Sequence, residues 1–264
     1  MTNERRVLVH PDKASLAGSV AARFITKVID VIEDRGEATV VLTGGTMGIA
    51  ILAAINDSAA RDSVDWKRVN FWWGDERWLP EGDAERNDHQ AREALLDHID
   101  IDESRVHPFL SSDKGVELDD AASLYAAELS DNAPEGHDGL PHFDITFLGV
   151  GPDGHIASLF PERGGIREKD LNVISVRNAP KPPPERLSLT LPVINSSQRV
   201  WLVLAGPDKA GALGLTLAGA SSIEVPAAGV EGRRRTLFFV DNEAAAEVPE
   251  NLTTPGLFWT GEDA

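Results

Sequence analysis

The chain has 264 residues, enough for one large hydrophobic core, and we expect a single domain over residues 1–264. Its 43 acidic and 25 basic residues give a formal net charge of -18, which disfavours nucleic acid and anionic membrane surfaces as partners. It has no cysteine, which excludes disulfides and thiolate metal ligands. With no apolar run near the roughly 18 residues of a membrane span and no secretory signal pattern, we expect a cytoplasmic protein. The sequence indicates no oligomeric state.

Short apolar runs alternate with longer amphipathic segments. Residues 5–10 predict a strand, and the segment after them places apolar side chains at fourfold spacing, typical of a helix with one buried stripe. These side chains are Leu16, Val20, Phe24, Val28 and Ile32. Residues 38–45 predict an apolar strand that ends in glycines, and residues 46–55 a helix that is apolar on most sides and therefore buried.

Further strands and helices continue this alternation. A strand within residues 68–78 runs into a charged turn, and Asn87 with Gln90 predicts a capped helix that carries Ala91, Leu95 and Ile99. The remaining predicted strands lie within residues 143–151, 171–178, 185–191, 199–206 and 236–240. Strands that alternate with helices predict an open, mostly parallel α/β sheet with helices on both faces.

Ligands of such sheets bind beyond the carboxyl ends of the strands. The loops after Leu42, Trp73, Leu148 and Leu204 should therefore converge on one site. The proline-rich segment 178–188 predicts a stiff surface connection, which either lies apart from this site or borders it.

A glycine-rich turn follows the strand within residues 143–151. The segment Gly149–Gly154 has the G-x-G-x-x-G spacing of a dinucleotide-binding turn. Such a site needs a long helix after the glycines, and Pro161 makes any helix here short. It also needs an acidic residue near the end of the next strand, where Arg177 and Asn178 stand instead. The pattern therefore disfavours a dinucleotide.

The same turn places Asp153 two positions before His155. A histidine can act as a general base near neutral pH, because its ordinary pKa is about 6.5, and a neighbouring carboxylate can orient it. The alternative is a structural turn, in which Asp153 bonds the backbone and His155 caps a short helix.

Two other loops predict an anion site. Gly44, Gly45 and Thr46, a potential N-cap, stand at a strand-to-helix junction, where free N–H groups and the helix dipole favour a phosphate. Arg77 and Lys209 follow two other strands and would supply positive charge. Alone, each feature is typical of an ordinary turn or a solvated surface charge. Together, at neighbouring strand ends, they favour a shared phosphate site.

Six motifs run through residues 38–213: VVLTGGT, WWGDERW, RNDHQAREALL, FLGVGPDGHIASLFP, PKPPPERLSLTLPVI and VLAGPDKAGAL. In this order and spacing they resemble the 6-phosphogluconolactonase family, and the pair GPDGHIASLFP and DERW is specific. The resemblance implies a Rossmann-like fold shared with glucosamine-6-phosphate deaminase. It also implies hydrolysis of 6-phosphoglucono-δ-lactone to 6-phosphogluconate in the pentose phosphate pathway, with no metal or organic cofactor.

The resemblance also implies roles for individual residues. His155 corresponds to the family's general base and Asp153 to its carboxylate partner. The implied substrate-binding residues are Gly44, Gly45, Thr46, Asp75, Arg77, Arg186 and Lys209. Two positions depart from the family: Arg86 replaces the usual Ser before Asn87, which is expected to alter the rim of the site, and Ile156 replaces a common Thr.

Two other functions fit parts of the sequence. Glucosamine-6-phosphate deaminases share the D-G-H turn, but they have F-N-E-P where this chain has SLFP, and they lack a match to Arg77. A non-catalytic sugar-phosphate sensor would be fused to a DNA-binding domain. Here the first strand begins near Arg5, which leaves no room for a helix-turn-helix, and the acidic charge disfavours DNA.

Overall fold

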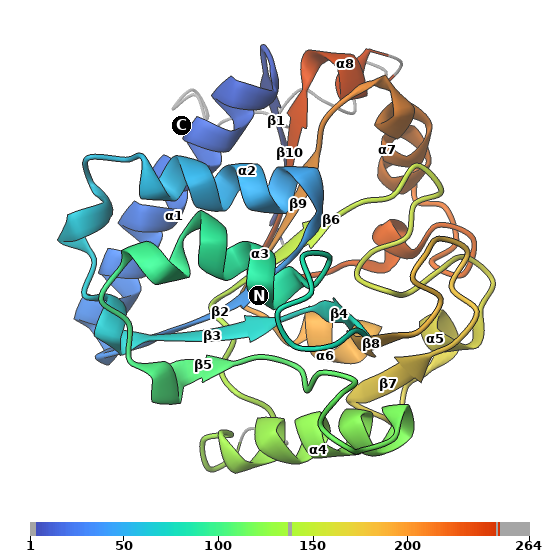
Figure 1. Cartoon of the computed structure of the whole chain (residues 1–264). Coiled ribbons are helices and arrows are strands. Elements are labelled where there is room, and N and C mark those ends of the chain that lie inside the picture. The colour runs from blue at the N-terminus through green and yellow to red at the C-terminus, as the bar shows by residue number, and fades with distance from the viewer. Residues whose placement is uncertain (1–3, 137–138, 247, 249–264) are drawn as a thin grey trace.

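The computed structural model describes residues 4–136, 139–246 and 248. Seven strands form one sheet in the order β1-β10-β9-β6-β2-β3-β5, and all neighbouring pairs are parallel (Figure 1). The strands are β1 (Glu4–His10), β2 (Ala38–Leu42), β3 (Val69–Trp73), β5 (Val106–His107), β6 (Ile145–Gly149), β9 (Arg199–Leu204) and β10 (Arg235–Asp241). The predicted parallel α/β sheet is confirmed.

A second, antiparallel sheet has the strand order β4-β8-β7. It consists of β4 (Asp75–Arg77), β8 (Arg186–Leu189) and β7 (Val173–Val176). Two predicted strands, 171–178 and 185–191, form here and not in the large sheet, and part of the predicted charged turn is itself a strand. The physical reason is the short connection between β7 and β8, which cannot hold the crossover that parallel strands require.

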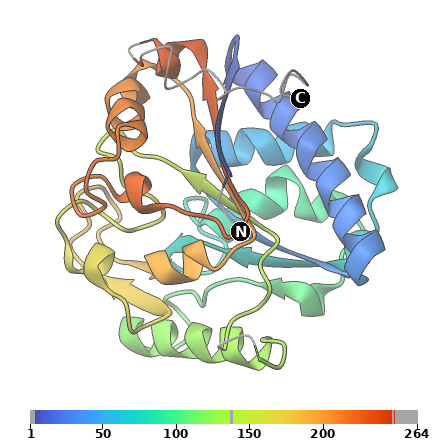
Figure 2. The same ribbon diagram turned by 180° about the vertical axis from the view of Figure 1, so that it is seen from behind.

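The helices are α1 (Lys13–Arg35), α2 (Gly45–Asn56), α3 (Asn87–Ala94), α4 (Leu118–Asp131), α5 (Gly164–Arg167), α6 (Leu191–Asn195), α7 (Ala210–Leu217) and α8 (Asn242–Ala245). Seen from behind, α1 runs along the large sheet (Figure 2). The five predicted apolar residues of its stripe are all buried. No helix of the described residues is long and apolar enough to cross a membrane.

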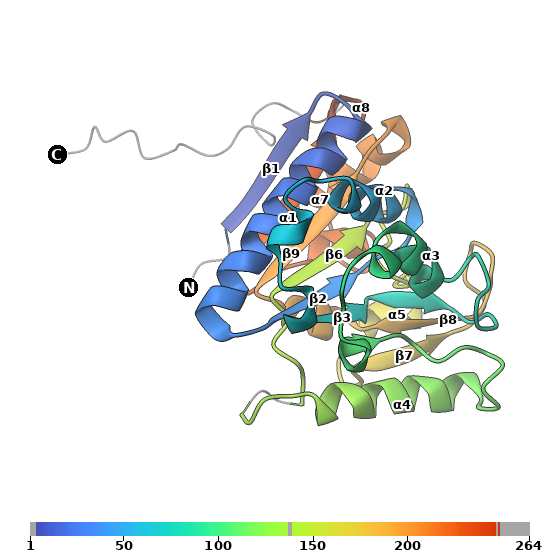
Figure 3. The same ribbon diagram turned by 60° about the vertical axis from the view of Figure 1, so that its left-hand side comes forward.

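Aromatic contacts show that helices cover both faces of the large sheet. On one face, Phe24 of α1 contacts Phe147 of β6, with ring centroids 5.4 Å apart, and α2 packs against α1. On the other face, Trp72 of β3 meets Tyr125 of α4 at 5.6 Å. Successive strand residues point to opposite faces, so β3 contributes Phe71 to the α1 side and Trp72 to the α4 side. Helix α4 also packs under β7 (Figure 3).

The third helix departs from its prediction. Asn87 is the first residue of α3 and not its N-cap, and the helix ends at Ala94, before Leu95 and Ile99. The start of α3 is capped from another element, because the Glu76 carboxylate accepts the N–H of Asn87 at 2.7 Å. The local sequence predicted that the side chain of Asn87 caps the helix, but the carboxylate of Glu76, from another element, caps it instead.

Phe24 tests how far the core depends on the contact between α1 and the sheet. Its side chain is fully buried and touches both Trp66 and Phe147. Phe24→Ala should lower the free energy of unfolding by about 3–5 kcal/mol, through lost transfer energy and a cavity. Urea denaturation measures this change. The control is Leu124→Ala on the exposed side of α4, expected to stay within about 0.5 kcal/mol, and equal effects would contradict the packing described.

Candidate active site

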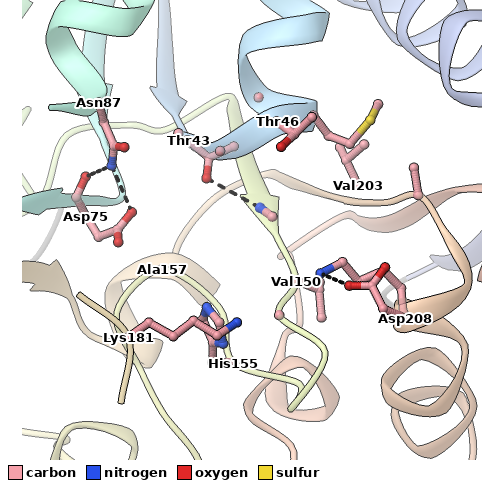
Figure 4. A pocket seen from close by; sticks show the side chains of 18 of the residues that line it. Thr43, Thr46, Asp75, Asn87, Val150, His155, Ala157, Lys181, Val203 and Asp208 are labelled. Carbon is pink, nitrogen blue, oxygen red and sulfur yellow. Dashed lines mark hydrogen bonds and ion pairs between the residues drawn. The ribbon is translucent and has the colours of Figure 1, made fainter. Parts of the chain in front are cut away.

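One pocket of about 330 Å³ lies at the carboxyl ends of β2, β3, β6 and β9. Residues from the loops after Leu42, Trp73, Leu148 and Leu204 all line it, so the predicted convergence is confirmed. It brings together eight predicted site residues: Gly44, Gly45, Thr46, Asp75, Arg77, His155, Arg186 and Lys209. Asp153 does not line the pocket and lies against His155 instead. Figure 4 shows Thr46 at the start of α2, Asp75 at the start of β4 and His155 in the loop after β6 around this space.

His155 and Asp153 form a close pair. Nδ1 of His155 lies 2.5 Å from Oδ1 of Asp153, and the imidazole also packs against the ring of Phe160 at 4.8 Å. Gly154, with φ of 80°, turns the chain so that the two side chains meet. The structural alternative is present only in part: Asp153 also accepts the N–H of His155 at 3.4 Å, but no helix follows for His155 to cap.

The environment of Asp153 favours its charged form. Partial burial raises the pKa of this carboxyl, but the hydrogen bond and the charge of His155, with backbone N–H groups, outweigh burial and lower the pKa to about 2. Asp153 therefore remains a carboxylate at neutral pH and can hold the imidazole through Nδ1. This leaves Nε2 as the nitrogen that can act on a ligand.

The turn before α2 presents backbone donors to the pocket. Gly44 is the N-cap of α2, so Thr46 is the second helical residue and the prediction of Thr46 as N-cap is wrong. No side chain caps this helix. A Cβ on Gly44 would lie 1.8 Å from Oδ1 of Asn87, and Gly45 has φ of 79°, so both positions need glycine. The uncapped start of a helix of this length can bind an anion.

Five basic side chains line the pocket among the described residues, against two acidic ones. Arg77, Arg186 and Lys209 were predicted, whereas Lys13 and Lys181 were not. Lys13 is the first residue of α1 and follows β1 closely. The sequence feature that could have indicated Lys13 as a site residue is its position just after another parallel strand. Lys181 belongs to the proline-rich segment, which therefore borders the site.

Arg186 and Lys209 already have partners. The Arg186 guanidinium donates to the carbonyl groups of Lys181, Pro182 and Pro183. Burial lowers the pKa of Arg186 from its usual range, an effect that Asp75 opposes. Lys209 Nζ lies 3.0 Å from the carboxylate of Asp208.

Asp75 forms the polar side of the pocket with two residues that the sequence analysis did not assign to the site. Its carboxylate accepts the hydroxyl of Ser158 at 2.7 Å. Its backbone carbonyl accepts the side-chain amide of Asn87 at 2.8 Å, and Figure 4 shows Asn87 beside Asp75. All three residues are buried. This network holds β4 against the D-G-H loop and leaves the carboxylate of Asp75 at the pocket wall.

Arg86 is not itself part of the rim of the pocket, although the sequence predicted a change there. Its side chain is fully buried and does not line the pocket. The guanidinium can be buried because carboxylates and backbone carbonyls surround it. Ile156, the other departure, is buried beside the D-G-H turn. Among the residues described, no cluster of three or more His, Asp or Glu side chains could hold a metal ion.

The lowered pKa of Asp153 predicts how the free energy of unfolding depends on pH. Its pKa in the folded chain, about 2, lies below the ordinary 3.8, so its contribution is fully present above about pH 4 and is lost as the pH falls toward 2. The difference in the free energy of unfolding between the wild type and Asp153→Asn should therefore be constant at neutral pH and shrink below about pH 4. Urea titrations at successive pH values measure it. Asp120→Asn, at an exposed position, controls for the change in net charge, and a difference that grows in acid would contradict the assignment.

Comparisons with known proteins find related sequences and structures. The family described as Glucosamine-6-phosphate isomerases/6-phosphogluconolactonase matches residues 11–239. The chain is 51% identical over 258 residues to a 6-phosphogluconolactonase from Streptomyces coelicolor, covering 97% of this chain and 99% of that protein. It is 44% identical over 243 residues to a 6-phosphogluconolactonase from Mycobacterium tuberculosis, covering 91% of this chain and 97% of that protein.

A solved structure extends the likeness to three dimensions. The crystal structure of 6-phosphogluconolactonase from Thermotoga maritima superposes with a TM-score of 0.77 at 26% identity, covering 90% of this chain and 100% of that one. The predicted resemblance is therefore confirmed over nearly the whole chain. On this evidence, the chain belongs to the glucosamine-6-phosphate isomerase/6-phosphogluconolactonase family.

Proposed function

We propose that this chain hydrolyses 6-phosphoglucono-δ-lactone to 6-phosphogluconate in the pentose phosphate pathway, as a cytoplasmic carboxylic ester hydrolase. The observation that carries the proposal is the His155–Asp153 pair, 2.5 Å between Nδ1 and Oδ1, at the edge of a pocket rich in basic groups. A base beside an anion site is the arrangement that a phosphorylated ester needs. The relatives at 51% and 44% identity bear the name of this activity.

His155 supplies the acid–base chemistry. A water molecule attacks the lactone carbonyl carbon while Nε2 of His155 takes one of its protons, and the carbonyl π electrons move to oxygen. When the oxyanion collapses, the carbonyl re-forms and the bond from this carbon to the ring oxygen breaks. The imidazolium returns the proton to the ring oxygen, which becomes a hydroxyl. The carboxylic acid then loses its proton to solvent, and the product is the gluconate.

Asp153 keeps the imidazole in the state that this sequence requires. Its carboxylate accepts the Nδ1 proton, so Nε2 has a free lone pair for the water proton. The negative charge also stabilises the imidazolium that exists between the two proton transfers. One histidine can therefore serve first as base and then as acid.

Other groups that line the pocket bind the phosphate. The start of α2 offers backbone N–H groups, and Arg77 and Lys209 add charge. Because the phosphate does not react, these contacts fix the position of the lactone and contribute binding energy. Asp75 has an acceptor that suits a sugar hydroxyl, and Arg186 braces the proline-rich segment at the pocket wall.

Lactone decay tests the reaction and its base together. The lactone is formed in situ from glucose 6-phosphate, and its decay above the spontaneous rate is compared between the wild type and His155→Ala. The wild type should accelerate decay, and the variant should lose about 10²–10⁴-fold in kcat, the usual contribution of general acid–base catalysis. His98→Ala, an exposed histidine, should retain full activity. No acceleration by folded wild type would reject the proposal and direct attention to a deaminase assay, then to plain sugar-phosphate binding.

Gly151 offers a way to disturb the pair without removing either side chain. A Cβ at this position would lie 2.0 Å from Nδ1 of His155 and 2.5 Å from Oδ1 of Asp153. Gly151→Ala should therefore displace the imidazole and lower kcat by about 10²-fold or more. Gly164→Ala is the matched control, because a Cβ there meets nothing within 4 Å. Unchanged kcat in Gly151→Ala would show that the precise position of the pair does not matter.

A further inference from the structure

We propose that Arg86 is a positioning residue for substrate binding, which acts on Arg77 through the carbonyl of Glu85. Arg86 itself does not line the pocket. This inference rests on the proposed function, since it takes Arg77 to bind the phosphate of the substrate. It assigns a role to a position where the sequence departs from the family pattern.

The first step is the unusual burial of Arg86. Its side chain is 2% exposed, and each of its five N–H groups has an acceptor. Nε and Nη2 bond the carboxylate of Asp88, at 2.9 and 3.3 Å. Nη1 donates to the carbonyls of Leu79 and Leu110, and Nη2 also donates to that of Phe109. The guanidinium thus joins the beginning of the loop over residues 79–86 to a second loop over residues 109–110.

The second step is the carboxylate of Glu76, which lies behind Arg77. Oε2 of Glu76 is 3.8 Å from Nη2 of Arg86. The same carboxylate accepts the backbone N–H groups of Arg77, Asn87 and Asp88, at 2.7, 2.7 and 2.9 Å. Arg86 is therefore the cation in a buried group of charges that also fixes the backbone of Arg77.

The third step is the side chain of Arg77. Among the described residues, its only side-chain hydrogen bond is from Nη1 to the carbonyl of Glu85, and it has no acidic partner. Glu85 precedes Arg86 in the chain, so the anchored guanidinium of Arg86 helps to fix this carbonyl, together with the hydrogen bonds that the backbone N–H groups of Glu85 and Arg86 donate to Asp83. Both the backbone and the side chain of Arg77 thus depend on the group around Arg86.

The consequence is a preorganised phosphate-binding group. A long arginine side chain that is free in solution loses rotamer freedom when it binds an anion. Holding the guanidinium at the pocket wall beforehand reduces this loss and strengthens binding. Loss of the Arg86 anchor should therefore raise KM. It should leave kcat, which depends on His155, nearly unchanged.

A double-mutant cycle separates positioning from simple stabilisation. It compares lactone hydrolysis by the wild type, Arg77→Met, Arg86→Met and the double variant. Arg77→Met should raise KM about tenfold through loss of a charge-assisted bond to phosphate. Arg86→Met should raise KM about three- to tenfold with kcat within about twofold, and it should raise KM less than about twofold further once Arg77 is gone.

Two further variants keep the test decisive. Arg86→Lys retains the buried charge but not the five-donor fork, so it should fold and raise KM about two- to fivefold. It therefore replaces Arg86→Met in the test if Arg86→Met does not fold. Arg35→Met, which breaks a different ion pair with the buried carboxylate of Asp144, controls for loss of stability and should leave KM unchanged. Thermal unfolding of every variant gives the stability comparison.

The outcomes distinguish the inference from the proposed function. A raised KM in Arg77→Met with an unchanged KM in the Arg86 variants, or fully additive effects in the double variant, would overturn the role of Arg86 alone. An unchanged KM in Arg77→Met would overturn both the role of Arg77 and that of Arg86, while the lactonase activity would stand. A wild type without lactonase activity would remove the function itself.

Discussion

The common direction of the parallel strands is the constraint on which the site depends. Strands β2, β3, β6 and β9 pair in parallel, so all four end at one edge of the sheet. Their interiors are mostly apolar and buried, and the charged side chains that line the pocket come after the strands end. Asp75 follows the last residue of β3 by two positions, and Lys209 follows the end of β9 by five. Strand direction therefore gathers residues from distant parts of the sequence around a single pocket.

Under the proposed function, the pocket has to bind an anion within a strongly acidic chain. With a net charge of -18, the distant acidic groups repel a phosphorylated substrate, but at physiological salt charges more than about 8 Å away are largely screened. The near field is different. Five basic side chains and the start of α2 face the pocket, and only Asp75 and Asp208 oppose them among its described lining residues. Local charge can thus outweigh the sign of the whole molecule.

Much of this arrangement could be predicted because it follows from periodicity. The buried stripe of α1 has helical spacing, and the positions where apolar strands end located the site loops. Features that depend on contacts distant in sequence could not be predicted. Asn87 carries a good capping side chain, yet its side chain bonds Asp75 and the helix is capped by Glu76. Lys13 had no local motif to mark it, since only the position of β1 in the sheet brings it to the pocket.

The least predictable feature is the charge behind the pocket wall. Burial raises the pKa of Glu76, and the charge of Arg86 and the backbone N–H groups of Asn87 and Asp88 act against this rise. Among the described residues, the polar contacts of the Glu76 side chain are with N–H donors. The carboxylate therefore fits this environment better than the protonated acid, which would need an acceptor for its proton. Arg86 is the cation that favours this carboxylate, and the carboxylate in turn holds the backbone of Arg77. The charges of Arg86 and Glu76, which do not line the pocket, thereby help to position Arg77, which does.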